Sequence, residues 1–203
     1  KKTISLKPDY AETYSNMGVA LKNQGKFDEA IDAYKKSISL KPNYAEAYDN
    51  MGVALKNQGK FDEAIDAYKK SISLKPLHAK AHNNLGVALQ AQGKLEVSLE
   101  AFKKSISLKP NYAEAYNNMG ITLKDQGKSE EAIEAYKKAL SLKPDYADGY
   151  NNLGITLQDK GKLEEAIEAY KKSISLKPDH ADAYNNMALA LQYQDKLEEA
   201  IEV

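Results

Sequence analysis

The chain has 203 residues, of which 42% are hydrophobic and 29% are charged, and its 29 basic and 29 acidic residues balance. This composition is too apolar for an intrinsically disordered chain, and no apolar run is long enough to cross a bilayer. Every basic residue is lysine, so the basic face and the guanidinium groups expected of a nucleic-acid-binding protein are missing, and we expect neither nucleic acid nor membrane as a partner.

Proline recurs at a fixed interval of 34 residues, at Pro8, Pro42, Pro76, Pro110, Pro144 and Pro178. A period of this size is typical of stacked repeats, in which each unit packs only against its neighbours. Residues 1–10 are interpreted as the end of a truncated repeat. Complete repeats are predicted at 11–44, 45–78, 79–112, 113–146 and 147–180, followed by a partial repeat at 181–203. The whole chain is therefore predicted to be a single solenoid without linkers.

Each repeat is predicted to contain two helices, as residues 113–146 illustrate. Two apolar stripes at helical spacing are separated by Gly127, which can adopt the left-handed turn that ends the first helix. Pro144 ends the second helix. Asp145 is predicted to be the N-cap of the next helix, with Asp148 completing a capping box. The first stripe consists of Tyr116, Met119, Gly120 and Leu123, and the second of Ala132, Ile133, Tyr136 and Leu140.

These positions resemble the tetratricopeptide repeat (TPR). The matching pattern is Tyr116-x2-Met119-Gly120-x2-Leu123, then Ala132-x3-Tyr136, then Pro144, with Tyr in place of Trp and Leu in place of Tyr. The resemblance recurs in register over the whole chain. It implies an all-α fold, a right-handed superhelical solenoid of antiparallel helix pairs, and a binding scaffold rather than a specific activity.

Two regions depart from the repeat pattern. In residues 79–112, Lys80 and His82 replace an acidic residue and a tyrosine, and Val97 replaces a glutamate. We favour drift in a tolerant scaffold over a special pocket. His180 is about 100 residues from His82, so no metal-binding constellation is indicated. In the last repeat Asp195 replaces the turn glycine, which predicts a looser helix pair.

No catalytic constellation is evident in the sequence. Catalysis needs a nucleophile beside a base, paired carboxylates in a cleft, or a metal cage. The carboxylates instead fall in the first turns of predicted helices, and the glycines recur at helix contacts and turns. We expect no enzyme activity and no cofactor. Cysteine is absent, which leaves the compartment open, with the cytoplasm as the default expectation.

Asparagine occupies one position of the first helix in every repeat, and we call this set the asparagine ladder. Asparagine is a mediocre helix former, so its recurrence needs a reason. Its amide matches the C=O and N–H groups of a peptide backbone, and adjacent helices about 8–10 Å apart would grip roughly every third residue of an extended peptide. Alternatively, each amide bonds the adjacent helix and fixes repeat stacking. The ladder consists of Asn16, Asn50, Asn84, Asn118, Asn152 and Asn186.

An aliphatic row lies beside the ladder on the same helices. It either contributes to the peptide-binding groove or fills the gap between adjacent first helices. The row consists of Val19, Val53, Val87, Ile121, Ile155 and Leu189.

The ladder resembles the one in the TPR region of O-linked N-acetylglucosamine transferases. That resemblance implies that the asparagines hold protein ligands by their main chain, in a protein-interaction scaffold. It also leaves open a substrate-recruiting region of a larger enzyme such as a glycosyltransferase. A carboxylate clamp of the chaperone-binding kind needs cations in the groove; the corresponding places hold Ser15, Asp49, Asn83 and Val19, with Lys80 the single basic candidate.

Weak head-to-tail self-association is a further hypothesis. The repeat fragments at the two ends together nearly complete one unit, and their apolar residues are of the types used at every internal repeat junction. Such a contact runs into open filaments unless the rotation closes. The residues expected to be exposed are Ile4 and Leu6 at one end, and Met187, Leu191, Leu197 and Ile201 at the other.

Overall fold

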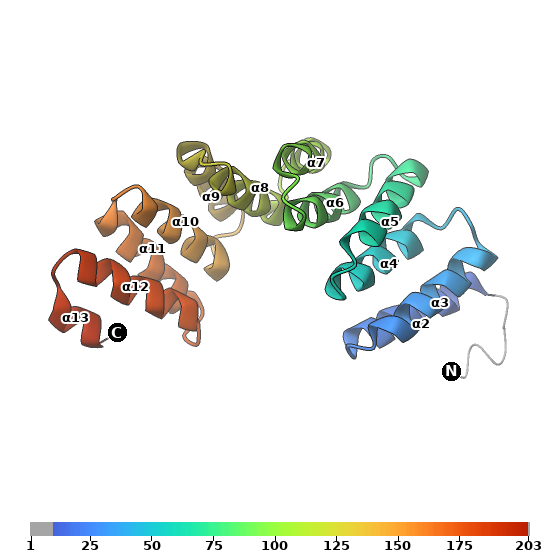
Figure 1. Ribbon diagram of the computed structural model, residues 1–203, viewed down its shortest axis with the longest axis horizontal. Helices are drawn as coiled ribbons and strands as arrows, with labels where there is room; N and C mark the ends of the chain where they lie inside the picture. The colour runs from blue at the N-terminus through green and yellow to red at the C-terminus, as the bar shows by residue number, and fades with distance from the viewer. Residues whose placement is uncertain (1–9, 203) are drawn as a thin grey trace. The chain divides into compact units, whose positions relative to one another are not determined.

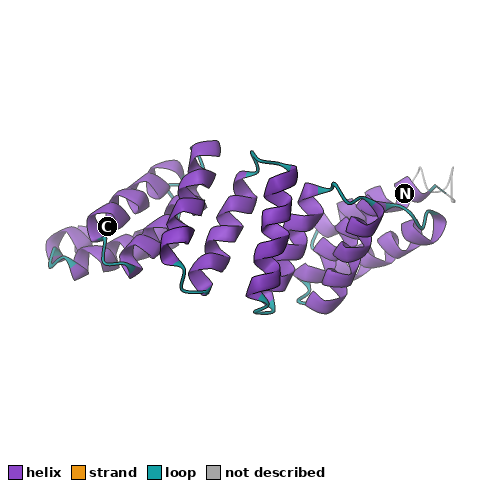
Figure 2. Cartoon of the chain, turned by 90° about the horizontal axis from the view of Figure 1, so that it is seen from above, coloured by secondary structure: helices purple, strands orange, loops and turns teal. Residues whose placement is uncertain are grey.

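The computed structural model describes residues 10–202 as successive helix pairs, with no strand in that part of the chain (Figures 1 and 2). The first helices are α2 (Ala11–Asn23), α4 (Ala45–Asn57), α6 (Ala79–Ala91), α8 (Ala113–Asp125), α10 (Ala147–Asp159) and α12 (Ala181–Tyr193). The second helices are α3 (Phe27–Leu40), α5 (Phe61–Leu74), α7 (Leu95–Leu108), α9 (Ser129–Leu142), α11 (Leu163–Leu176) and α13 (Leu197–Glu202). The expectations for the truncated repeat before Tyr10, including those for Ile4 and Leu6, lie outside the described residues.

The chain divides into two compact units, Lys1–Lys109 and Pro110–Val203. The first contains α2 to α7 and the second α8 to α13. Every second helix packs against the first helix of its own repeat, and α3, α5, α9 and α11 also pack against the first helix of the next repeat. The all-α solenoid of antiparallel helix pairs predicted from the sequence is confirmed.

The turn between the helices of a pair forms as predicted. Gly127 has a φ of 75°, its N–H donates to Lys124 O at 2.8 Å, and the Lys128 N–H donates to Leu123 O at 2.9 Å. This pair of bonds is the Schellman motif, which satisfies the last carbonyls of the helix. Asp195 adopts the same left-handed conformation, with a φ of 59°. The Asp195 N–H donates to Gln192 O at 3.0 Å and the Lys196 N–H to Leu191 O at 3.1 Å, so the turn between α12 and α13 is retained (Figure 1).

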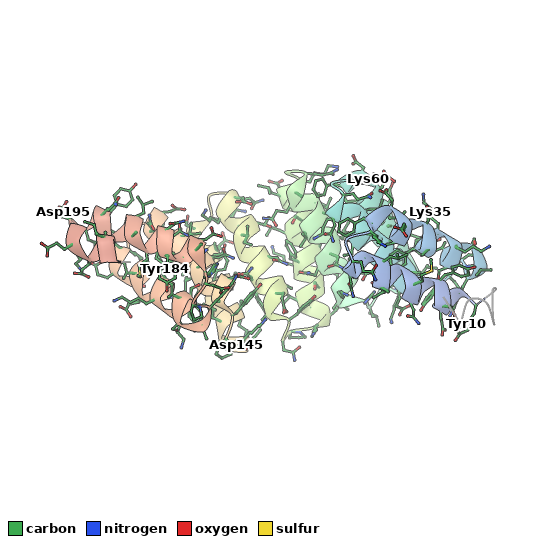
Figure 3. All side chains as sticks on the ribbon, turned by 90° about the horizontal axis from the view of Figure 1, so that it is seen from below. Tyr10, Lys35, Lys60, Asp145, Tyr184 and Asp195 are labelled. Atoms are coloured by element: carbon green, nitrogen blue, oxygen red, sulfur yellow. The ribbon has the colours of Figure 1, made fainter. Side chains whose placement is uncertain are left out.

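The predicted capping box at Asp145 and Asp148 is wrong. Helix α10 has Tyr146 as its N-cap residue and no side-chain cap hydrogen bond. The Tyr146 N–H donates to Lys143 O at 3.2 Å, so residues 143–146 form a turn and Asp145 occupies its third position, in the loop before the helix (Figure 3). Pro144 fixes the φ of the second position of that turn, which moves the start of the helix beyond the aspartate.

A glycine on each first helix from α2 to α10 allows the close approach of an aromatic ring from its partner helix; α12 has Ala188 at this position. A Cβ atom added at Gly52 would lie 2.6 Å from the Tyr68 ring, and one added at Gly120 would lie 2.7 Å from the Tyr136 ring. Both tyrosines are buried. The glycine in the repeat motif is therefore required by packing, because any larger residue would displace the ring.

The first helices lie closer together than the second helices in both units. In the first unit α2 contacts α4, and α4 contacts α6, whereas the described Cα atoms of α3, α5 and α7 do not approach one another within 8 Å. The same holds for α8, α10 and α12 against α9, α11 and α13 in the second unit. Closer spacing places the first helices on the inner side of each unit's curvature. We call the solvent-facing surface of these helices the inner face.

Candidate peptide-binding surface

The asparagine ladder lies on the inner faces of the two units. Asn16 is exposed, and the other five asparagines are partly exposed. A side chain in this position can be reached by a ligand and can also contact the adjacent helix. Local sequence explains the placement: in the helices from α2 to α10 the asparagine follows a buried residue and precedes the Met or Leu of the apolar stripe, so it lies at the edge of the buried face.

Three ladder amides form hydrogen bonds with the preceding repeat. In each case the acceptor is the side chain one residue before that repeat's own ladder asparagine. These bonds connect neighbouring first helices, and they leave the ladder Oδ1 atom and the second N–H group available to a ligand. The bonds run from Asn84 Nδ2 to Asp49 Oδ1 at 3.0 Å, from Asn152 Nδ2 to Asn117 Oδ1 at 3.2 Å, and from Asn186 Nδ2 to Asn151 Oδ1 at 3.0 Å.

The acceptors belong to a second polar row, which is buried. The row consists of the buried residues Ser15, Asp49, Asn83, Asn117 and Asn151. In the sequence analysis, Ser15, Asp49 and Asn83 appeared only as positions at which a carboxylate clamp would need a lysine or arginine. The sequence pattern that could have identified this row is a spacing of 35 residues between each polar residue and the ladder asparagine that bonds to it.

Asp49 distinguishes the first unit from the second. A carboxylate has acceptors only, so the Asn84 amide must direct its Nδ2 toward Asp49 and its Oδ1 away. Lys80 Nζ is 4.0 Å from the other carboxylate oxygen. Asn117 and Asn151 are neutral amides at the equivalent places, so the second unit has no such charge there.

The aliphatic row takes part in packing. Val19 and Val53 are partly buried against the core of the first unit, and Val87, Ile121 and Ile155 are also partly buried. Leu189 is 41% exposed. Only part of each side chain is therefore available to a ligand.

Each unit also has a groove on its outer side, between consecutive second helices. In the first unit it encloses about 310 Å³ above Tyr48, Met51 and Leu55, with Lys35 on one wall and Glu63 on the other. The second unit has the equivalent groove, of about 460 Å³, over Tyr150, Leu153 and Leu157. The charged residues that line the groove of the first unit balance, whereas the groove of the second unit has Lys137 on one wall and three glutamates on the other.

A serine, a histidine and an aspartate meet in the second unit, a contact that sequence reasoning missed. His180 Nδ1 lies 2.8 Å from Ser173 Oγ, and His180 Nε2 lies 3.6 Å from Asp148 Oδ1. Ser173 is fully buried, and its hydroxyl donates to Ala147 O at 2.9 Å. A buried hydroxyl that already donates its proton to a main-chain carbonyl cannot attack a substrate, so this contact is structural.

Metal sites and membrane-spanning helices are both absent from residues 10–202. That part of the chain contains no group of three or more His, Cys, Asp or Glu side chains arranged to hold a metal ion. No helix in the same range is long and apolar enough to cross a membrane.

Solved structures similar to this chain include proteins described as TPR proteins. MamA is 32% identical, with 81% of this chain and 96% of that chain covered and a TM-score of 0.70. YrrB, described as a TPR protein with an unusual peptide-binding site, is 26% identical over 91% of this chain and 95% of that chain, with a TM-score of 0.67. A thermophilic TPR protein of Thermus thermophilus, TTC0263, is 23% identical over 90% and 99% of the two chains, with a TM-score of 0.74, and supports the fold alone.

Family models cover most of the sequence. A model described as TPR repeat matches residues 54–93, 89–127, 122–161 and 156–195. Two models described as tetratricopeptide repeat match residues 11–44 and 33–66. No curated protein sequence matches the chain. From its helix pairs, its turn glycines and these matches, the chain belongs to the tetratricopeptide repeat family, a family of protein-interaction scaffolds.

Proposed function

We propose that the inner face of each unit binds an extended peptide segment of a partner protein through the amides of the asparagine ladder. The observation that carries this proposal is the orientation of the ladder. Asn84, Asn152 and Asn186 are each held by one N–H group. The remaining Oδ1 and N–H of such an amide match the N–H and C=O of a peptide main chain.

Holding the amide in advance favours binding, because a side chain that is already ordered loses less conformational entropy when the ligand arrives. The stacking and gripping roles are therefore compatible in one residue. The peptide-binding site named for YrrB supports the same class of ligand for this chain. Main-chain recognition predicts modest dependence on the ligand's sequence.

Two ladder positions in the first unit separate gripping from stacking. Asn84 donates to Asp49, whereas Asn50 forms no such bond among the described residues. Asn50→Ala and Asn84→Ala are each expected to weaken binding about two- to tenfold, from about 0.5–1.5 kcal/mol per hydrogen bond. Asn57→Ala, an exposed asparagine at the end of α4 and outside the ladder, serves as the control.

The assay is fluorescence anisotropy with labelled extended peptides of several unrelated sequences, alongside thermal melting of each variant. Gripping predicts that both ladder variants lose affinity for all the peptides alike. If Asn50→Ala binds normally, and Asn84→Ala changes only the melting temperature, the ladder serves stacking and the proposal is wrong.

Head-to-tail self-association is a second proposal, carried by apolar side chains in the last repeat. Tyr193 is 64% and Ile201 86% exposed, and Tyr193 lines a groove of about 600 Å³ with Leu163 and Leu189. The expectation that Met187 and Leu191 are exposed is wrong: both are buried, because they lie on the face of α12 that packs into the helix pairs. Sedimentation velocity at two concentrations tests the proposal, and a mass independent of concentration contradicts it.

A further inference from the structure

The three hydrogen bonds between ladder amides and preceding repeats all run in the same sense. In each bond the ladder asparagine is the donor, and the buried side chain of the preceding repeat is the acceptor. The Nδ2 side of each amide is therefore turned toward the preceding first helix, and the Oδ1 side is turned away from it. The donors are Asn84, Asn152 and Asn186.

At Asn84 this sense is imposed by the chemistry of the acceptor. Asn84 Nδ2 lies 3.0 Å from Asp49 Oδ1, and the Asp49 side chain is only 4% exposed. A carboxylate has no proton to donate. An amide turned the other way would therefore lose this hydrogen bond and place its own oxygen against a buried negative charge. Lys80 Nζ lies 4.0 Å from the other oxygen of Asp49, so the two carboxylate oxygens have different partners.

Asn84 is the ladder position of the first unit that is held in this way. Asn50 forms no such bond among the described residues, and the place equivalent to Asp49 in the preceding repeat is Ser15. A serine hydroxyl can donate as well as accept, so it would impose no orientation on an amide. The orientation of the ladder in the first unit therefore depends on the contact between Asp49 and Asn84.

An oriented amide distinguishes the two directions in which a peptide main chain can lie. An extended residue presents its N–H and its C=O to the same side and can exchange both bonds with one facing group. Along the peptide, the N–H of a residue comes before its C=O. The peptide C=O must meet the remaining N–H of Asn84, on the side of α4, and the peptide N–H must meet Oδ1, on the side away from α4. The peptide then runs opposite to the order of the repeats.

We propose that Asp49 sets the direction of a bound peptide in the first unit, with the C-terminal end of the peptide toward α2 and its N-terminal end toward α6. This inference rests on the proposed function, since it requires a peptide on the inner face. Asp49 is a positioning residue, because it is buried and acts through Asn84. A reversed peptide loses both bonds to Asn84. At about two- to tenfold for each bond, the proposed direction is favoured on the order of tenfold.

The test is paramagnetic broadening in the NMR spectrum of the whole chain. The probes are peptides of about nine residues, which match three ladder positions. They are acetylated and amidated, so that terminal charges do not orient them, and they carry a nitroxide on a cysteine at one end or the other. The chain has no cysteine, so the label stays on the peptide. A C-terminal label is expected to broaden the amides of α2 more than those of α6, and an N-terminal label the reverse.

The second unit provides an internal reference. Asn152 and Asn186 have the same sense as Asn84, so a C-terminal label is expected to broaden α8 more than α12. Asp49→Leu keeps a side chain of similar shape and removes the acceptor. This variant is expected to bring the ratio of the two directions close to one in the first unit, and to leave the pattern of α8 and α12 unchanged.

Two further variants separate the acceptor from the charge. Asp49→Asn restores an acceptor oxygen of the kind that Asn117 offers to Asn152, and it is expected to retain the preferred direction. Lys80→Gln is the matched control. It removes the cation that faces Asp49 and keeps the carboxylate, so it is expected to leave the direction unchanged.

The outcomes distinguish this inference from the proposed function. If peptides bind and Asn84→Ala weakens them, but both labels broaden α2 and α6 alike in the wild type, the inference is overturned and the proposed function stands. A preference that persists in Asp49→Leu overturns the inference in the same way. Peptides that leave the amides of the first helices unperturbed overturn both.

Discussion

The buried tyrosine of each second helix has a hydroxyl group whose partner differs between repeats. Tyr136 forms a hydrogen bond with Thr156, and Thr156 donates its own proton to Asn152 O at 3.0 Å, so Tyr136 is the donor. At the position equivalent to Thr156, the first unit has Ala54, and the Tyr34 hydroxyl is buried without a partner among the described residues. Burial also raises the pKa of Tyr34 to about 12. Removing these hydroxyls should therefore have unequal effects.

The magnitudes follow from what each substitution leaves behind. Tyr136→Phe removes one satisfied hydrogen bond and is expected to lower the free energy of unfolding by about 0.5–1.5 kcal/mol. Thr156→Val leaves the Tyr136 hydroxyl buried and unpaired, at a cost of about 1–3 kcal/mol. The double variant should be less destabilised than the sum of the two single variants, because no unpaired hydroxyl then remains. Tyr34→Phe removes a hydroxyl that has no partner and is expected to be neutral or stabilising. Phe102 shows that the site accepts phenylalanine.

The assay is guanidinium denaturation of the four variants, fitted as a chain of coupled repeats because a solenoid is not strictly two-state. The coupling energy of the Tyr136–Thr156 pair comes from the double-mutant cycle. Equal losses for Tyr34→Phe and Tyr136→Phe would refute the reasoning. A coupling energy of zero would do so as well.

Three further predictions concern other parts of the fold. Gly120→Ala is expected to destabilise the chain by about 1–3 kcal/mol, because the new Cβ would press on the Tyr136 ring; thermal melting measures this. Asp195→Gly is expected to stabilise the last turn by up to about 1 kcal/mol, since it relieves the left-handed conformation, and slower amide exchange in α13 would show it. The Lys75 hydrogen bond lowers the pKa of Glu46, so the pair stabilises the fold at neutral pH and loses that effect as the pH falls through the carboxyl's titration; Glu46→Gln should show a smaller loss of melting temperature on acidification than wild type.

The helix pairs and their turns could be predicted because each is encoded within one repeat. Gly127 follows the last apolar residue of its helix, and Pro144 closes the repeat, so both signals are local. The capping prediction at Asp145 failed although its signal was also local. Pro144 recruits that aspartate into a turn, and the two local preferences compete for the same residue.

The asparagine ladder could be located from the sequence, but its hydrogen bonds could not be assigned. The bond between Asn84 and Asp49 joins residues 35 apart, and forms only at the particular angle at which two repeats stack. Periodicity shows that such residues are equivalent and says nothing about how far apart their side chains lie. The contact of Ser173, His180 and Asp148 was missed for the same reason.

The polar row behind the ladder has a consequence for the alignment of a bound peptide. If all ladder positions are chemically alike, a peptide main chain binds equally well after it shifts by one ladder position. A ladder made only of amides therefore does not fix the register of the peptide. Asp49 and Lys80 interrupt this equivalence within the first unit. If a peptide occupies the inner face, this charged pair distinguishes one position along the first unit from the others and so favours one register of the peptide. Neutralising both residues would leave the affinity largely intact. It would increase the number of registers in which the same peptide binds.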